Sequence, residues 1–260
     1  WVISEHGNLQ FSKSASRLFF GTSPEPRQKD TLQLAENRPN VQVWSWDEPV
    51  QYTVQDYNKE KELKRSYQAV YHVNSGRICQ LADEKLPQIL LGDEGDAPLA
   101  LLSTSRPYSL SSMWEGRTRS DYYTVSLEDG SRRLLASADY GRYRLSPQGK
   151  YAYWYAETDS CWYTLSMADG KKNQLTTPAS FLAWDEENDV PDYPNAHGVA
   201  GWTERDEALL IYDRYDIWKF NPDAMKEPVN LTVNGRKNRI SYRLVKLDKE
   251  ERVIDLNKPQ

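Results

Sequence analysis

The segment SPQGKYAYWY, residues 146–155, places a tight turn directly before a run of aromatic and small residues. Proline and glycine stand at favoured turn positions, and the aromatic run that follows has the composition of a β-strand. A second pair of this kind comes next: CWYTLSMADGKKNQLTT, residues 161–177, turns at Asp169-Gly170 between two strand-like runs. Together the two segments predict a unit of four short antiparallel strands.

The same four-strand pattern recurs along the chain. The expected units cover residues 8–82, 88–136, 140–177 and 198–233, with a partial fifth unit over 240–257. Their third strands are expected to begin near Tyr67, Tyr122, Trp162 and Ile217, a repeat of about 40–55 residues that is typical of β-propeller blades. We therefore expect an all-β propeller of about four blades plus a partial one, as a fragment of a larger ring. An ordinary meander or sandwich is the alternative, because it also uses short strands and glycine turns.

An incomplete ring is an open arc, which leaves apolar sheet faces uncovered at its two ends; this favours self-association.

The repeats place Cys79 and Cys161 in units that are not adjacent, so we expect two free thiols. Helical signals are nearly absent, and the exception is the charge-dense segment 56–67, which we interpret as a solvated helical turn or loop.

The composition excludes several classes of function. A net charge of −5 argues against a nucleic-acid surface, which requires a clustered basic face. No apolar run approaches the roughly 18 residues that a membrane span requires. The chain is rich in amphipathic aromatic residues, with 9 Trp and 17 Tyr against 5 Phe, and such rings suit half-buried strands and wet clefts.

Three segments carry a resemblance to a known family. The unit SPQGKYAYWYAETDSCWYTLSMADGKKNQLT, residues 146–176, is similar to blades of the propeller domain in the prolyl oligopeptidase and dipeptidyl peptidase IV group of serine peptidases, and also to blades of TolB-like propellers. A more specific segment is WDEENDVPDYPNAHGVAGWTERDEALLIYDRYDIWKFNP, Trp184–Pro222, with PVNLTVNGRKNRISYR after it. It resembles large bacterial homologues of that group, of the Bacteroides type, and Asn40–Tyr71 fits the same subgroup.

This resemblance implies a multidomain enzyme. In that group an N-terminal propeller lies over a C-terminal α/β-hydrolase domain that carries Ser, Asp and His, and the propeller restricts and orients peptide substrates. The implied partners are this hydrolase domain, absent from the chain, and a peptide. The implied location is the periplasm or otherwise outside the cytoplasm, with no membrane span, nucleic acid or cofactor. A protein-interaction scaffold of the TolB type is the alternative.

The sequence itself contains no pattern for serine-peptidase chemistry. A nucleophile elbow requires Gly-x-Ser-x-Gly, in which small residues permit the strained strand-to-helix turn. Ser23 has Gly21 before it but Glu25 after it, and the three histidines, His6, His72 and His197, are scattered. We therefore expect no catalytic residue in this chain.

An acidic, proline-containing loop is the candidate contact site. Its residues are Trp184, Asp185, Glu186, Glu187 and His197, with Asp189 and Asp192 beside them. In the dipeptidyl peptidase relatives a pair of glutamates holds the amino terminus of the substrate, because paired carboxylates favour an ammonium group. The sequence around this loop does not match that motif, so the role is not transferred. The simplest interpretation is a solvated loop that packs on a neighbouring blade or on the hydrolase domain, and substrate or partner contact is the alternative.

Other candidate sites are weaker. The acidic loop lacks the ligand spacing of an EF-hand, so Ca²⁺ binding is a remote alternative and we expect no metal site. Asp47 and Glu48 lie beside tryptophans, so a sugar-binding or glycosidase propeller is a further alternative; hydrolysis would need two carboxylates facing one another across a cleft. The run from Asp213 to Asp216 is interpreted as structural, with its carboxylates linking a strand end to its neighbour.

Overall fold

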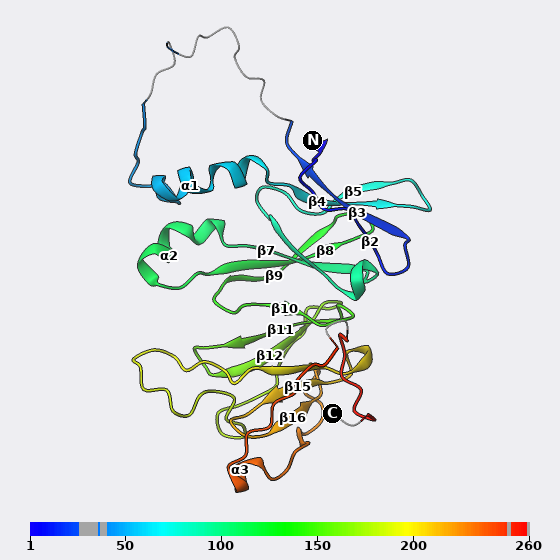
Figure 1. Ribbon diagram of the computed structural model, residues 1–260, viewed down its shortest axis with the longest axis vertical. Coiled ribbons are helices and arrows are strands. Elements are labelled where there is room, and N and C mark those ends of the chain that lie inside the picture. Colours follow the sequence, from blue (N-terminus) through cyan, green and yellow to red (C-terminus); the bar gives the residue numbers. More distant parts are fainter. Residues whose placement is uncertain (26–35, 37–40, 249–250, 259–260) are drawn as a thin grey trace.

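Short strands that lie close together in the sequence pair to form four antiparallel sheets, which stack in chain order (Figure 1). The computed structural model describes residues 1–25, 36, 41–248 and 251–258. Sheet 1 contains β1 (Val2–Ile3), β2 (Gln10–Phe11), β3 (Arg17–Ser23), β4 (Tyr67–His72) and β5 (Ile78–Gln80). Sheet 2 contains β6 (Gln88–Leu91), β7 (Leu99–Thr104), β8 (Ser120–Ser126) and β9 (Arg132–Asp139).

The second half of the stack repeats this plan. Sheet 3 contains β10 (Arg144–Leu145), β11 (Tyr151–Ala156), β12 (Cys161–Ser166) and β13 (Lys172–Gln174). Sheet 4 contains β14 (Val199–Trp202), β15 (Leu209–Tyr212), β16 (Ile217–Phe220) and β17 (Val229–Asn230). Four meandering sheets stacked face to face are consecutive blades of a β-propeller, so the predicted fold class is confirmed.

Alternate residues of each strand face the sheets on either side. In β11, Ala152 and Trp154 belong to the core between sheets 2 and 3, whereas Tyr153 belongs to the core between sheets 3 and 4. This explains why β11 is apolar on both faces, since a strand covered on both sides has no solvent face. The first of these cores contains a column of rings: Tyr143 stacks on Tyr122 at 4.0 Å and on Trp154 at 3.9 Å between centroids.

The strands of every sheet end at two opposite rims of the molecule, and the connections differ between these rims. One rim, called the turn end, carries tight turns closed by glycines in the left-handed region, including Gly76, Gly130, Gly149 and Gly170. The opposite end, called the loop end, carries the connections between the second and third strands of the sheets. There lie α1 (Tyr52–Leu63) and the segment that holds η3 (Arg106–Tyr108) and α2 (Ser109–Glu115) (Figure 1).

Only the first of these helices was expected. The charge-dense segment 56–67 does contribute to α1, which begins earlier, at Tyr52, and buries none of its residues. Neither α2 nor the short α3 (Gly235–Asn238) was expected, because neither has an amphipathic repeat long enough to be recognised in the sequence. None of the helices in the described part of the chain is long and apolar enough to cross a membrane.

The segment expected to begin a fifth unit takes a different form. Residues 241–248 form no strand, and of residues 251–258 Ile254 forms a parallel bridge with Thr203 of sheet 4. The backbone of this segment bonds to groups other than a neighbouring strand: Leu244 N–H donates to the Tyr212 hydroxyl at 3.0 Å, and Tyr242 N–H to the Tyr215 carbonyl at 2.7 Å. The expected fifth unit is thus reduced to one bridge, because these contacts hold 242–244 against the end of β15.

The two cysteines lie in different sheets. Cys79 is in β5 of sheet 1 and Cys161 is in β12 of sheet 3, and both are free thiols, as expected. Burial raises the pKa of each thiol, which disfavours the reactive thiolate.

Candidate functional site

The acidic loop joins β13 to β14 and returns on itself. Trp184 and Ala196 form an antiparallel bridge that closes the base of a long loop. We call this loop, residues 184–197, the acidic strap. Asp185 N–H donates to the Asn195 carbonyl at 2.8 Å and His197 N–H to the Ala183 carbonyl at 3.0 Å, which fixes the base of the strap. Trp184 packs against the core between sheets 3 and 4, so its ring is mainly structural.

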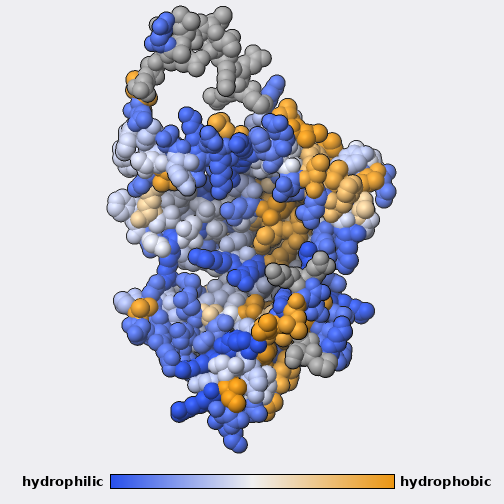
Figure 2. Space-filling model, viewed as in Figure 1, coloured by the Kyte–Doolittle hydropathy of each residue, from blue (hydrophilic) through white to orange (hydrophobic). Residues whose placement is uncertain are grey.

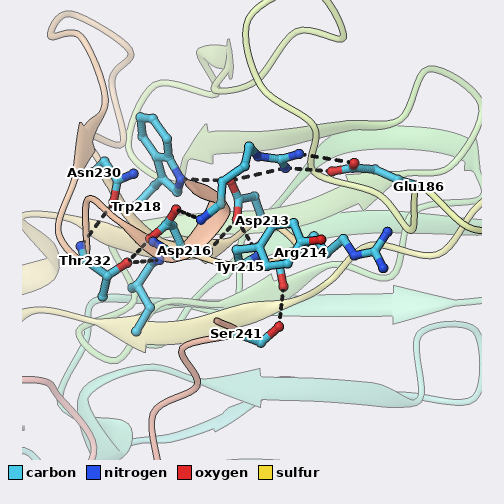
Figure 3. A network of polar contacts seen from close by, with 12 residues as sticks. Glu186, Asp213, Arg214, Tyr215, Asp216, Trp218, Asn230, Thr232 and Ser241 are labelled. Atoms are coloured by element: carbon cyan, nitrogen blue, oxygen red, sulfur yellow. Dashed lines mark hydrogen bonds and ion pairs between the residues drawn. The ribbon is translucent and has the colours of Figure 1, made fainter. Parts of the chain in front are cut away.

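The two adjacent glutamates of the strap are held by arginines of sheet 4 and of the segment that follows it. Glu186 accepts two hydrogen bonds from the Arg236 guanidinium, at 2.6 and 3.2 Å (Figure 3). Glu187 accepts one from Arg214 at 2.5 Å. The hydrogen bond from Arg236 lowers the pKa of Glu186 despite partial burial. Because both carboxylates already have cationic partners, they do not form a free pair that could receive an ammonium group.

Tyr215 completes this cluster from the turn between β15 and β16. The guanidinium carbons of Arg214 and Arg236 each lie 5.3 Å from the centre of its ring, a distance at which cations are attracted to an aromatic face. Neither arginine was predicted from the sequence to contact the acidic loop. Arg236 lies 50 residues from Glu186, so no local pattern links them.

The turn itself is built around two buried aspartates, as the sequence predicted. Asp216 accepts hydrogen bonds from the Thr232 hydroxyl and from the Gly235 and Arg236 N–H groups, at 2.5, 2.9 and 3.1 Å (Figure 3). Burial raises its pKa, but these donors outweigh burial and the net shift is downward. Asp213 accepts from the Tyr215 N–H, the Asp216 N–H and the Trp218 indole N–H; these carboxylates thus tie β15, β16 and α3 together.

The His197 side chain lies beside this cluster. Its Nε2 is buried and has no hydrogen-bond partner among the described residues. Burial lowers the pKa of His197, and the positive charge of Arg243 lowers it further, against the opposing effect of Asp185 and Glu186. A neutral imidazole is therefore favoured. The other histidines lie elsewhere: His72 is buried with Nε2 3.0 Å from the Leu127 carbonyl, and His6 lies near Glu5.

The far end of the strap contacts two other sheets. Asp192 accepts a hydrogen bond from Arg117, which follows α2 in the connection between β7 and β8. The same guanidinium lies 4.6 Å from the Tyr193 ring centre. Glu157, in the β11–β12 turn of sheet 3, lies 3.6 Å from Arg117. The acidic strap therefore reaches across the loop end of sheets 2, 3 and 4. Its contact with Arg117 was not expected from the sequence.

A second feature of the loop end is an aromatic cleft of about 440 Å³ between residues 43–55 and α2. Its walls include Trp44, Trp46 and Trp114, whose exposed fractions are 67%, 90% and 86%. Trp44 packs on Tyr52 with 5.0 Å between ring centres. Three exposed tryptophans around one cleft form an unusually large exposed apolar surface. Such surfaces usually mark an interaction site.

The carboxylates beside this cleft do not face one another across it. Glu48 lines the cleft and lies 3.4 Å from the Gln55 amide nitrogen, whereas Asp47 accepts a hydrogen bond from its neighbour Ser45. A glycosidase requires two carboxylates on opposite sides of the sugar, and these two are adjacent on one loop. Within the described residues, no group of three His, Cys, Asp or Glu side chains is placed to hold a metal ion.

Comparison with known proteins gives only distant similarities. No family model and no curated protein matches the chain. The similar solved structures include TolB from Acinetobacter baumannii, with 12% identity over 86% of this chain and 42% of that chain and a TM-score of 0.37. A putative TolB from Agrobacterium tumefaciens has 10% identity, covers 86% of this chain and 61% of that chain, and has a TM-score of 0.39.

An enzyme is also among the similar structures. An acylaminoacyl peptidase in complex with Z-Gly-Gly-Phe-chloromethyl ketone has 8% identity, covers 88% of this chain and 32% of that chain, and has a TM-score of 0.39. The chain thus spans less than two thirds of the length of each of these three proteins. The fold assignment rests on the four stacked sheets of this chain and not on these similarities.

Proposed function

We propose that this chain is the non-catalytic propeller region of an exported serine peptidase of the prolyl oligopeptidase group, and that its loop end contacts and orients peptides for a separate α/β-hydrolase domain. The observation that carries this proposal is the difference between the turn end and the loop end of the sheets. The turn end consists of tight turns, whereas the loop end carries α1, α2 and the acidic strap. Long connections on a rigid sheet scaffold are where binding residues concentrate.

The aromatic cleft supplies the chemistry for peptide contact. Apolar peptide side chains can pack against Trp46 and Trp114, whose indole N–H groups remain able to bond to a peptide carbonyl. In this proposal the acidic strap has a different task. Its glutamates are occupied by arginines, so the strap supports the shape of the loop end, while Tyr193, which is half exposed, borders the path of the peptide.

Two measurements test this function. First, the chain alone is expected to cleave no peptide substrate, because its histidines are not associated with a nucleophile; measurable hydrolysis that copurifies with the chain would contradict the proposal. Second, tryptophan fluorescence is expected to change when peptides with apolar side chains are added. The variant Trp46→Ala/Trp114→Ala should bind such peptides about tenfold more weakly, the loss expected for one or two aromatic contacts.

A matched control separates cleft contacts from general surface effects. Leu247 is 95% exposed and lies outside the cleft, so Leu247→Ala is expected to bind peptides as the wild type does. Equal affinity of the wild type and the double tryptophan variant would show that peptides do not use the cleft. Failure of all variants and of the wild type to bind any peptide would favour the scaffold alternative of the TolB type.

A further inference from the structure

The aromatic cleft at the loop end is lined mainly by rings and polar groups. Among the described residues, four aromatic side chains line it: Trp44, Trp46 and Tyr52 from residues 43–55, and Trp114 from α2. Figure 2 shows hydrophilic and intermediate residues over α1 and α2, whereas hydrophobic residues gather on the other side of this view, over the N-terminal strands. The cleft therefore offers amphipathic rings to a ligand, with aliphatic side chains in the minority.

The charge of the cleft wall is negative. Glu48 is the one charged residue among the described residues that line it, and no lysine or arginine of the described chain does so. The Glu48 carboxylate lies 3.4 Å from the Gln55 amide nitrogen, and it forms no ion pair with another described residue. Aromatic faces carry a negative potential, and the carboxylate adds a full negative charge. The cleft therefore attracts a cation and repels an anion.

The cluster at the acidic strap shows which cation completes such a set of groups. The Arg236 guanidinium bonds to Glu186 at 2.6 Å, and its carbon lies 5.3 Å from the centre of the Tyr215 ring. Arg214 bonds to Glu187 at 2.5 Å and lies equally far from the same ring. Each guanidinium thus contacts a carboxylate and an aromatic ring at once. The described residues of the cleft wall provide rings and a carboxylate but no guanidinium.

We propose that the aromatic cleft binds the arginine side chain of a peptide. This inference rests on the proposed function, in which peptides enter the cleft, and it names the peptide side chain that is recognised. The guanidinium packs over an indole ring and pairs with Glu48, while the apolar stem of the arginine packs on ring surface. A planar guanidinium stacks on an aromatic ring, whereas the ammonium of lysine is compact and strongly hydrated, so arginine is preferred to lysine.

Blocked peptides that differ at one residue test this proposal. The peptides Ac-Gly-Gly-X-Gly-Gly-NH2 carry arginine, citrulline or norleucine at X, and tryptophan fluorescence measures their binding at about 0.15 M salt. Citrulline has the shape of arginine without its charge, and norleucine is apolar. The arginine peptide is expected to bind about tenfold more tightly than the citrulline peptide, which is the gain expected from a cation over a ring together with an exposed ion pair.

Two variants separate a local contact from the overall charge of the chain. Glu48→Gln keeps the shape of the side chain and removes its charge, so it should reduce the preference for arginine over citrulline to about threefold and leave the citrulline peptide unaffected. Asp56→Asn makes the same change in net charge at an exposed residue of α1 that does not line the cleft, and it should keep the full preference. Circular dichroism establishes that both variants fold.

The possible failures of this inference and of the proposed function can be told apart. Equal binding of the arginine, citrulline and norleucine peptides would overturn this inference but not the proposed function. A preference that Glu48→Gln leaves unchanged would place the cation away from the cleft. A loss of equal size in Glu48→Gln and Asp56→Asn would show that the preference reflects net charge alone. Failure of the wild type to bind any of the three peptides would contradict both the inference and the proposed function.

Discussion

Trp154 illustrates how a single residue joins two blades. Its side chain is 1% exposed, stacks on Tyr143 of the chain before β11, and lies 5.5 Å from the Tyr163 ring beside it on the same sheet. The amino group of Lys172 lies 5.2 Å from its ring centre. A ring held on several sides at once leaves a large cavity when it is removed, because neighbouring rigid sheets cannot collapse into the space.

We therefore expect Trp154→Ala to lower the free energy of unfolding by about 3–5 kcal/mol. Trp46→Ala is the matched control, because Trp46 is 90% exposed and its loss should change stability by no more than about 0.5 kcal/mol. Urea unfolding followed by circular dichroism measures both. Similar midpoints for the two variants would show that the ring column contributes little to stability.

Asp216 leads to a prediction about pH. Its pKa is lowered from 3.8 in the folded chain, so its ionised form stabilises the fold above that value, and this contribution is lost as the pH falls through the folded pKa. Asp216→Asn should cost about 1–3 kcal/mol at neutral pH, since its N–H and hydroxyl donors lose an anionic acceptor. The difference from wild type should shrink in acid. Asp189→Asn, on the exposed surface of the strap, is the control and should follow the wild-type profile. A constant difference at all pH values would contradict this role.

At the scale of elements, the acidic strap is a long connection fastened at both ends. Arg214 and Arg236 hold its first turn, and Arg117 holds Asp192 near its far end. These pairs are partly exposed, and exposed ion pairs each contribute little to global stability. Their effect is local: they restrict a segment that has few apolar contacts of its own.

Loss of one fastening should therefore appear as local opening. Arg117→Ala is expected to speed proteolytic cleavage within 185–195 several-fold while leaving the global unfolding midpoint nearly unchanged. Arg77→Ala serves as the control, because Arg77 pairs with Glu128 at the turn end, far from the strap. Cleavage sites identified by mass spectrometry distinguish the two. Equal rates for both variants would show that the Arg117 contacts do not restrain the strap.

At the scale of the whole molecule, stability depends on how closely adjacent sheets approach. Gly149, in the first turn of sheet 3, would place an added Cβ 3.0 Å from the Ala97 Cβ and 3.1 Å from the Gly92 Cα of sheet 2. The Asp93 N–H also donates to the Pro147 carbonyl at 2.6 Å, so the two turns interlock. An added Cβ here would therefore force the two turns to move apart by a few tenths of an ångström.

A comparison of two glycines isolates this packing. Gly149→Ala and Gly76→Ala share the strain of a left-handed backbone, about 1–2 kcal/mol, because φ is 73° and 70°. Nothing lies within 4 Å of a Cβ at residue 76, so only Gly149→Ala should carry an additional cost, of about 1–3 kcal/mol from overpacking. Thermal unfolding measures the difference. If the two variants unfold together, contact between the turns is not a determinant of stability.

The strands and turns were readable from the sequence because they depend on local chemistry. A Ser-Pro-x-Gly-Lys or Asp-Gly turn sets the direction of the chain within four residues, and a strand is recognisable within six, so the residues of the blade at 144–174 are enough to outline it. The helix α2 was missed for the same reason: its seven residues, SLSSMWE, have no side-chain N-cap and no repeat that distinguishes them from a loop.

What the sequence could not determine is which distant side chains meet. It identified Glu186 and Glu187 as an acidic pair. Only the packing of the strap against sheet 4 brings them to Arg236 and Arg214, so that each carboxylate has a cationic partner. Long arginine side chains can reach many partners, and 50 residues separate Glu186 from Arg236, so the choice depends on where the sheets place the backbone. The cleft around Trp114 is likewise decided by the tertiary structure, because residues 43–55 and α2 are far apart in the sequence and meet only in the folded chain.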